Sequence, residues 1–82
     1  IGENAFLNCN DLKEITIPSS VTSIGEGAFC ECKSLIQVLF EKYSTLTSIE
    51  KGAFSKCISL SQITIPSSVI SLKKEFLMNV NH

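Results

Sequence analysis

The sequence lacks the residues on which most catalytic and metal sites depend. It has no tryptophan and a single histidine, His82, which is its last residue. Nucleophilic catalysis requires a base beside the nucleophile, and zinc sites group cysteine and histidine at short, regular spacings. The four cysteines are far apart except for Cys30 and Cys32. The sequence therefore predicts a non-enzymatic chain without a metal or another cofactor.

Excess charge and long apolar runs are also missing. Seven basic and eight acidic residues are spread along the chain and give a net charge of −1. The lack of a basic stripe argues against nucleic acid as a partner. No apolar run approaches the roughly 20 residues that span a bilayer, so we expect no membrane insertion. No secretory leader pattern is visible, and composition leaves the compartment open.

What the sequence does contain is one segment repeated along its whole length. Copies occupy residues 1–23, 24–48 and 49–71, and a partial copy occupies 72–82. Self-similarity at a fixed period of 20 to 50 residues is typical of solenoids. Because the chain starts in mid-pattern and its last copy is partial, we expect it to be a section of a longer array.

Aligned copies separate apolar columns from variable ones. A column that stays apolar in each copy predicts a position where like residues pack on one another in successive coils. The apolar columns are Ile1/Ile24/Ile49/Leu72, Ala5/Ala28/Ala53, Phe6/Phe29/Phe54/Leu77, Leu12/Leu35/Leu60, Ile15/Val38/Ile63, Ile17/Phe40/Ile65 and Val21/Leu46/Val69. Together they predict one continuous core.

Each copy has one strand-like stretch. Residues 12–18 alternate apolar and polar side chains with β-branched residues, which predicts a half-buried strand, and residues 35–41 and 60–66 correspond to them. One strand per coil, each followed by a crossover, predicts a parallel sheet. Pro18 and Pro66 should end their strands because proline cannot donate to the ladder.

The A-F-x-x-C stretches predict one or two helical turns on the side opposite the strands, because their apolar residues have helix-like spacing. Glu3, Glu26 and Glu50 recur at the start of these stretches, where a carboxylate favours the positive end of a helix. The glycines fit turn positions that require unusual backbone angles.

The pattern L-x-x-I-x-I-P-S-S-V-x-x-I-G-x-x-A-F-x-x-C resembles the leucine-rich repeat of the Treponema-pallidum-type, or BspA-like, subfamily, over essentially the whole chain. The resemblance implies an α/β solenoid: a right-handed coil with one parallel β-strand per ~23-residue repeat and short helical turns opposite a concave sheet. It also implies roles in adhesion and protein–protein contact, often at the cell surface or outside the cell.

Cys9, Cys32 and Cys57 share one column. The favoured interpretation is a ladder of buried free thiols, because free cysteine behaves as a small hydrophobic residue. A disulfide between adjacent coils remains possible, since equivalent Cα atoms should lie about 5 Å apart, but a column of three leaves one cysteine unpaired.

The outward face of the strands is the candidate partner-binding surface. Its six residues are Glu14, Thr16, Gln37, Leu39, Gln62 and Thr64. The second copy departs from the others, with Glu41 in place of proline and two additional residues within 41–45. This insertion is either a tolerated surface loop or, through Leu39 and Tyr43, an exposed apolar contact point for a partner.

Two functions fit these features. The first is a protein-binding or adhesion module, and the alternative is a structural spacer within a longer array that has no ligand of its own. A spacer should have interchangeable outward residues in every copy, and the second copy differs, which favours binding. Self-association through exposed terminal repeats is also possible, since such coils present unpaired strand edges.

Overall fold

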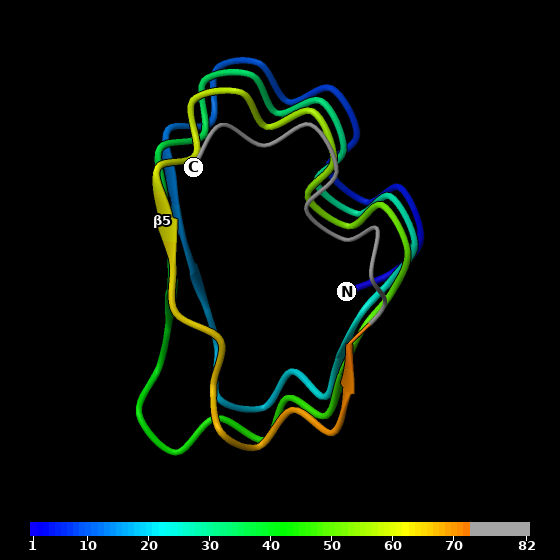
Figure 1. The fold of residues 1–82 in the computed structure, drawn as a ribbon, viewed down its shortest axis with the longest axis vertical. Helices are drawn as coiled ribbons and strands as arrows, with labels where there is room; N and C mark the ends of the chain where they lie inside the picture. Colours follow the sequence, from blue (N-terminus) through cyan, green and yellow to red (C-terminus); the bar gives the residue numbers. More distant parts are fainter. Residues whose placement is uncertain (73–82) are drawn as a thin grey trace.

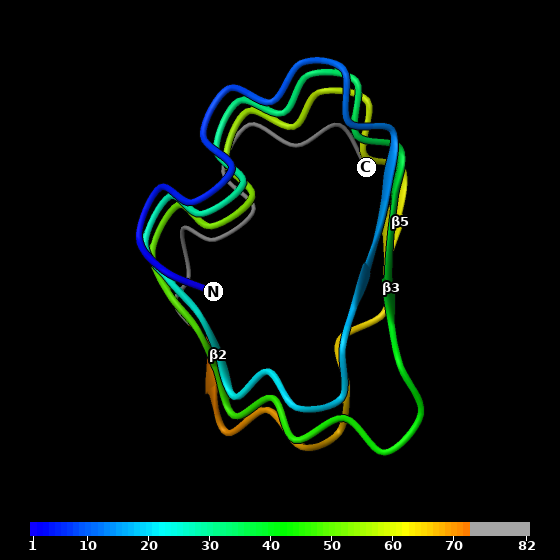
Figure 2. The same cartoon turned by 180° about the vertical axis from the view of Figure 1, so that it is seen from behind.

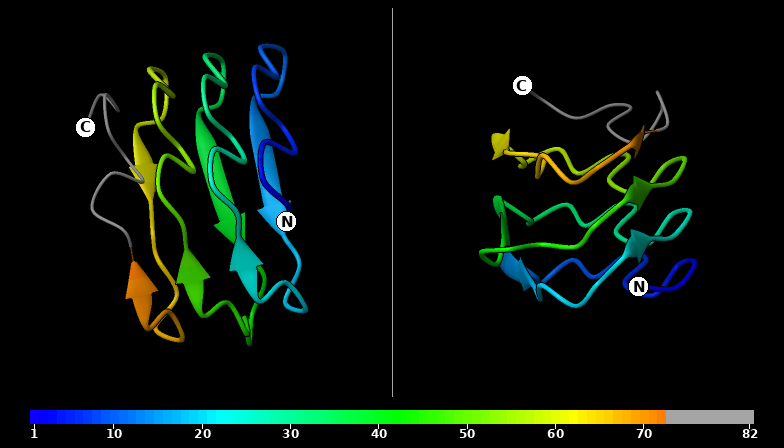
Figure 3. Two further views of the ribbon diagram at one scale, coloured as in Figure 1. Left: turned by 90° about the vertical axis from the view of Figure 1, so that its right-hand side faces the viewer. Right: turned by 90° about the horizontal axis from the view of Figure 1, so that it is seen from below.

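The computed structural model describes residues 1–72, which wind into three stacked coils (Figures 1 and 3). Coil 1 comprises residues 1–23, coil 2 residues 24–48 and coil 3 residues 49–71. The predicted partial copy lies outside the described residues from position 73 onwards. Successive coils follow nearly the same path, so like positions of the three copies lie next to one another. The solenoid architecture is therefore confirmed, while its right-handedness stays a prediction.

Each coil contributes two strands rather than the single strand that the sequence predicts. The first parallel sheet has the order β1 (Glu14–Ile17), β3 (Gln37–Phe40), β5 (Gln62–Ile63). The second has the order β2 (Ser23–Ile24), β4 (Ser48–Ile49), β6 (Ser71–Leu72). The prediction of one strand per repeat is therefore wrong. The sequence does not reveal the second strand, because two residues are too few to show an alternating pattern.

The pairing register joins equivalent positions of neighbouring copies. Residue Glu14 pairs with Gln37, which pairs with Gln62 in turn. In the second sheet Ser48 lies between Ser23 and Ser71. Since a shift of one residue would turn every buried side chain outward, the apolar columns fix this register.

The A-F-x-x-C stretches form β-turns, so the prediction of helical turns is wrong: no helix occurs in residues 1–72. In coil 2 the N–H of Cys32 donates to the carbonyl of Phe29 at 3.3 Å. The third residue of this turn, Glu31, has a φ of 62°, as type II turns require at that position. Comparable positive φ values occur within these stretches at Asn8 and Lys56, and immediately before them at Asn4, Gly27 and Gly52.

Hydrogen bonds between coils explain why no helix forms. The N–H of Phe6 donates to the carbonyl of Ala28 at 2.7 Å, and the N–H of Phe29 donates to that of Ala53 at 2.7 Å. An amide that bonds to the next coil cannot also close a helical turn within its own coil. The glutamates that precede these stretches consequently have no helix N-terminus to stabilise, and that predicted role is wrong.

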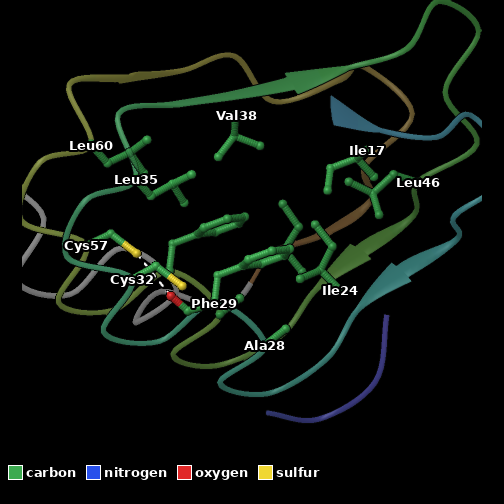
Figure 4. Packing of buried hydrophobic residues seen from close by; sticks show 13 residues of the cluster. Ile17, Ile24, Ala28, Phe29, Cys32, Leu35, Val38, Leu46, Cys57 and Leu60 are labelled. Atoms are coloured by element: carbon green, nitrogen blue, oxygen red, sulfur yellow. Dashed lines mark hydrogen bonds between the residues drawn. The ribbon is translucent and has the colours of Figure 1, made fainter. Parts of the chain in front are cut away.

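The core fills the space between the two sheets and the turns (Figure 4). The ring of Phe29 stacks between those of Phe6 and Phe54, with centroid separations of 5.0 and 5.1 Å and interplanar angles of 2° and 1°. The fully enclosed residues come mostly from coils 2 and 3, whereas Ala5 of coil 1 is exposed because coil 1 has a neighbouring coil on one side only.

The cysteine column forms a ladder of free thiols. The Sγ–H of Cys57 donates to the carbonyl of Phe29 at 3.1 Å (Figure 4), and that of Cys32 donates to the carbonyl of Phe6 at 3.1 Å. All four cysteines are free. Burial raises the pKa of the Cys57 thiol to about 12. Cys32 and Cys57 are therefore buried free thiols, as the ladder interpretation predicts, and each also donates a hydrogen bond to the preceding coil.

Candidate functional site

The six outward residues of the first sheet are all exposed, as predicted. Glu14, Gln37 and Gln62 form one row across the three strands. Thr16 lies beside Leu39 in the next outward row, and Thr64 follows the end of β5. This face therefore carries mainly carboxylate, amide and hydroxyl groups around one apolar side chain.

The ladder between coils 2 and 3 ends earlier than the ladder between coils 1 and 2. Strand β3 pairs with β1 as far as Phe40 and Ile17, but β5 pairs with β3 only as far as Ile63 and Val38. The sequence explains the loss of the last pair. In coil 2 the N–H of Glu41 donates to the carbonyl of Ile17 at 3.0 Å, whereas the equivalent residue of coil 3 is Pro66, which has no N–H to donate.

The loop that follows β3 is fastened to coil 1. The carboxylate Oε1 of Glu41 accepts a hydrogen bond from the N–H of Ser19 at 2.8 Å. The N–H and the hydroxyl of Thr45 both donate to the carbonyl of Ser19, at 3.1 and 2.6 Å. Figures 1 and 2 show this green loop projecting beyond the matching turns of the other coils. The two additional residues therefore extend coil 2 outward on the side where coil 3 turns away.

A groove of about 590 Å³ lies between the loop of coil 2 and the strand end of coil 3; we call it the coil 2–3 groove. Its lining residues are Gln37, Val38, Leu39, Phe40, Glu41, Tyr43, Ser44, Gln62, Thr64, Pro66, Ser67 and Ser68. Five of the seven predicted contact residues are among them: Gln37, Leu39, Tyr43, Gln62 and Thr64. The other two, Glu14 and Thr16, lie on β1 outside the groove.

The wall formed by residues 66–68 was not anticipated from the sequence. The sequence feature that could have revealed it is the residue after the strand, which is Glu41 in the second copy and Pro66 in the third. This difference predicts that the two strands end differently. At the inner end of the groove the coils meet again, because the hydroxyl of Ser68 donates to the carbonyl of Leu46 at 2.6 Å. The groove is thus a gap between two points where the coils are bonded to each other.

The groove has few charged groups. Glu41 is the only carboxylate in its lining, no lysine or arginine belongs to the lining, and Oε1 of Glu41 accepts a hydrogen bond from the N–H of Ser19 in coil 1. The Nζ of Lys42 lies 5.9 Å from the centroid of the Tyr43 ring. The groups offered to a ligand are therefore amides, hydroxyls, an aromatic ring, the Leu39 side chain and the exposed carboxylate of Glu41.

The described residues contain no group of three or more histidine, cysteine or acidic side chains placed to hold a metal ion. Within the same part of the chain, no helix of the length and hydrophobicity needed to cross a membrane occurs.

Comparison with known proteins agrees with this architecture. A family described as the BspA type leucine rich repeat region (6 copies) matches residues 1–82. The chain belongs to the BspA-type leucine-rich repeat family. Members of this family generally act in binding or structural roles rather than as enzymes, and leucine-rich repeats generally mediate protein interactions. No curated protein matches the chain.

Solved leucine-rich repeat structures resemble this one over most of its length. A leucine-rich repeat protein from Bacteroides capillosus shares 41% identity with a TM-score of 0.87, covering 99% of this chain and 56% of its own. The pneumococcal vaccine antigen PcpA shares 31% identity with a TM-score of 0.82, covering 85% of this chain and 17% of its own. A leucine-rich repeat protein of T. pallidum shares 25% identity with a TM-score of 0.62, covering 94% of this chain and 46% of its own. The BspA-type chain therefore spans 56% or less of each of these structures.

Proposed function

We propose that the chain is a protein-binding module and that its partner contacts the coil 2–3 groove. One observation carries the proposal: five exposed residues, chosen from the sequence because they face outward or lie in the insertion, line one groove of about 590 Å³. Tyr43 is 86% exposed and Leu39 is 39% exposed. Aromatic side chains surrounded by polar groups, such as Tyr43, are the usual anchors of protein interfaces.

The spacer function is the second candidate, and the coils themselves argue against it. The outward residues of coils 1 and 3 are nearly interchangeable, with a threonine in each. Coil 2 replaces that threonine with Leu39 and lengthens the following loop. A spacer requires only regular coils, and the irregular strand and loop of coil 2 form a groove. The difference between coil 2 and the other coils therefore favours binding.

The setting we propose is the cell surface or the extracellular space, with adhesion as the role of the interaction. The support is the BspA-type family and the description of one relative as a pneumococcal vaccine antigen. Standard interfaces bury about 800 Å² on each partner. A groove shared by two coils supplies only part of such an area, so we expect these coils to act together with neighbouring repeats of a longer array.

The test is capture of a protein partner from surface and cytosolic extracts by a longer array containing these coils. The parent is compared with the Leu39→Ser/Tyr43→Ser double variant. Ile70→Ser is the matched control, because Ile70 is an apolar side chain 86% exposed, as Tyr43 is, but it lies outside the groove. We expect the double variant alone to lose the partner. Equal capture by all three would remove the groove as the binding site, and no capture by any would favour the spacer.

A further inference from the structure

We infer that Glu41 and Thr45 are positioning residues, which hold the loop after β3 in the conformation that presents the Tyr43 ring to a partner protein. This inference rests on the proposed function and deepens it, because it assigns part of the partner affinity to two residues that act through Tyr43. It is carried by the bonds on either side of the loop, the backbone conformation of Tyr43 and the exposure of its ring.

The loop of coil 2 does not close in the way that the matching turns of the other coils do. In coil 1 the N–H of Val21 donates to the carbonyl of Pro18 at 3.1 Å, and coil 3 has the equivalent bond at 3.2 Å. The equivalent N–H of coil 2, that of Leu46, donates instead to Oγ of Ser44 at 3.2 Å. With its two additional residues, this loop therefore depends on bonds to another coil for its shape.

Coil 1 supplies those bonds on both sides of the loop, and they all go to the backbone of Ser19. Before Tyr43, Oε1 of Glu41 accepts the N–H of Ser19 at 2.8 Å, where the next bond of a parallel ladder would have a main-chain carbonyl as its acceptor. After Tyr43, the N–H and the hydroxyl of Thr45 donate to the carbonyl of Ser19 at 3.1 and 2.6 Å. One residue of coil 1 thus fixes the loop on either side of Tyr43.

Tyr43 itself has an unusual backbone conformation. Its φ is 62°, which disfavours a bulky side chain, and such a conformation persists only where the surrounding structure determines it. The ring is 86% exposed. The Nζ of Lys42 lies 5.9 Å from its centroid, near the outer limit of a cation–π contact. The ring is therefore held through the backbone of the loop and not by packing against the core.

A fixed anchor binds more tightly than a mobile one. Ordering a loop on binding costs free energy, and the apparent affinity falls with the fraction of molecules that have the competent conformation. Thr45 provides the cleanest test of this effect, because it does not line the groove. An effect of its hydroxyl on binding has to pass through the loop.

Backbone ¹⁵N relaxation of the labelled 82-residue chain tests whether the loop is held. The order parameter of the Tyr43 amide should be about 0.85, as in rigid backbone, and should fall toward about 0.6 in Glu41→Ala and in Thr45→Val. Glu41→Gln and Thr45→Ser keep the atoms that form the bonds, so they should keep the parent value. A value below about 0.6 in the parent, or an unchanged value in Glu41→Ala and Thr45→Val, would overturn the inference. A loss in Glu41→Gln as large as in Glu41→Ala would assign the effect to charge and also overturn it.

Thr47→Val is the matched control. The N–H and the hydroxyl of Thr47 both donate to the carbonyl of Thr22 in coil 1, at 2.8 and 3.0 Å, which is the pattern that Thr45 makes with Ser19. Thr47 is also exposed and outside the groove. Its variant loses the same kind of bond between coils, away from Tyr43, so it should leave the order parameter of Tyr43 unchanged.

Partner capture by the longer array tests whether this positioning serves binding. We expect Thr45→Val to weaken the affinity about fivefold, as the loss of one net hydrogen bond predicts, Thr45→Ser to restore it and Thr47→Val to leave it unchanged. Equal affinity of Thr45→Val and the parent would overturn the inference. The protein-binding function would still stand if the Leu39→Ser/Tyr43→Ser variant lost the partner. No capture by the parent would remove that function, and the inference with it, whatever the order parameters are.

Discussion

Two regions of the solenoid differ in how closely the coils repeat one another: the side formed by the A-F-x-x-C turns, called the turn side here, and the carboxyl ends of the strands in the first sheet. On the turn side, equivalent phenylalanines stack at 5.0 and 5.1 Å, and equivalent amides bond to equivalent carbonyls in the next coil. At the strand ends, β3 continues two residues further along its neighbour than β5 does. The repeat is thus nearly perfect in one region and broken in the other.

The difference follows from burial. Phe29 and Cys32 are fully enclosed, so a change of shape or register there would leave a cavity or a clash in all the neighbouring coils. The loop after β3 is exposed, and insertions in exposed loops cost little free energy. The buried turns therefore provide a rigid frame, and the strand ends can vary to form a binding surface.

The largest effect should come from the centre of the frame. Phe29→Ala removes a ring that stacks on both sides, and we expect a loss of about 3–5 kcal/mol in the free energy of unfolding. Chemical denaturation measures it. Tyr43→Ala is the control, since that ring is exposed, and it should change stability by less than about 0.5 kcal/mol. A small loss for Phe29→Ala would mean that the turn side is not the frame.

The thiol ladder should make stability depend on alkaline pH. The raised pKa of Cys57, about 12 against 9.0, keeps its proton in the folded state while the unfolded thiol ionises. The contribution of Cys57 to the free energy of unfolding is therefore fully present below pH 9. It is lost between pH 9 and 12, at a rate of about 1.4 kcal/mol per pH unit at most. Unfolding curves measured across this range should show a shallower pH dependence for Cys57→Ala than for the parent. An identical slope would mean that Cys57 does not stay protonated in the fold.

Backbone strain on the turn side should be relieved by one substitution. Lys56 has a φ of 61°, a conformation that disfavours most side chains but suits asparagine. We expect Lys56→Asn to raise the unfolding free energy by about 0.5–1 kcal/mol. Lys51→Asn, at an exposed site without a positive φ, should not. Equal effects of the two would assign the gain to charge rather than to the backbone.

The smallest effect on stability should come from the strand end itself. Pro66→Ala supplies an N–H at the position where Glu41 donates in coil 2, so we expect β5 to lengthen toward β3 and the groove to narrow. The gain of a hydrogen bond is offset by the lost rigidity of proline, which leaves stability nearly unchanged. Hydrogen exchange should show protection of the new amide of residue 66. Pro18→Ala in coil 1 is the control, and its new amide should exchange freely.

The frame could be predicted from the sequence because buried positions repeat. The columns containing Phe29, Cys32 and Leu35 are apolar in all three coils; their members are enclosed in coils 2 and 3 and partly buried in coil 1. The turns were mistaken for helices because A-F-x-x-C spacing fits both, and the bonds between coils that decide the matter join residues far apart in sequence. A two-residue strand such as β2 carries no periodic signal at all.

The candidate site could be predicted only in part. Leu39 and Tyr43 were recognised because the second copy differs from the others, and the structure places both in the groove. The opposite wall, with Pro66 and Ser67, was missed because these residues conform to the repeat. Pro66 and Ser67 form a wall of the groove because coil 2 has Glu41 in place of the proline. Only a comparison of the two neighbouring copies shows this difference.

The central claim is that the insertion of coil 2 serves binding and not folding. Deleting residues 42–43 leaves E-S-T-L where the other copies have P-S-S-V, and so restores a turn of regular length. The most direct measurement is partner capture by this deletion variant, in a longer array whose thermal midpoint is checked against the parent. We predict an unchanged midpoint and lost capture. Full capture by the stably folded variant would contradict the claim.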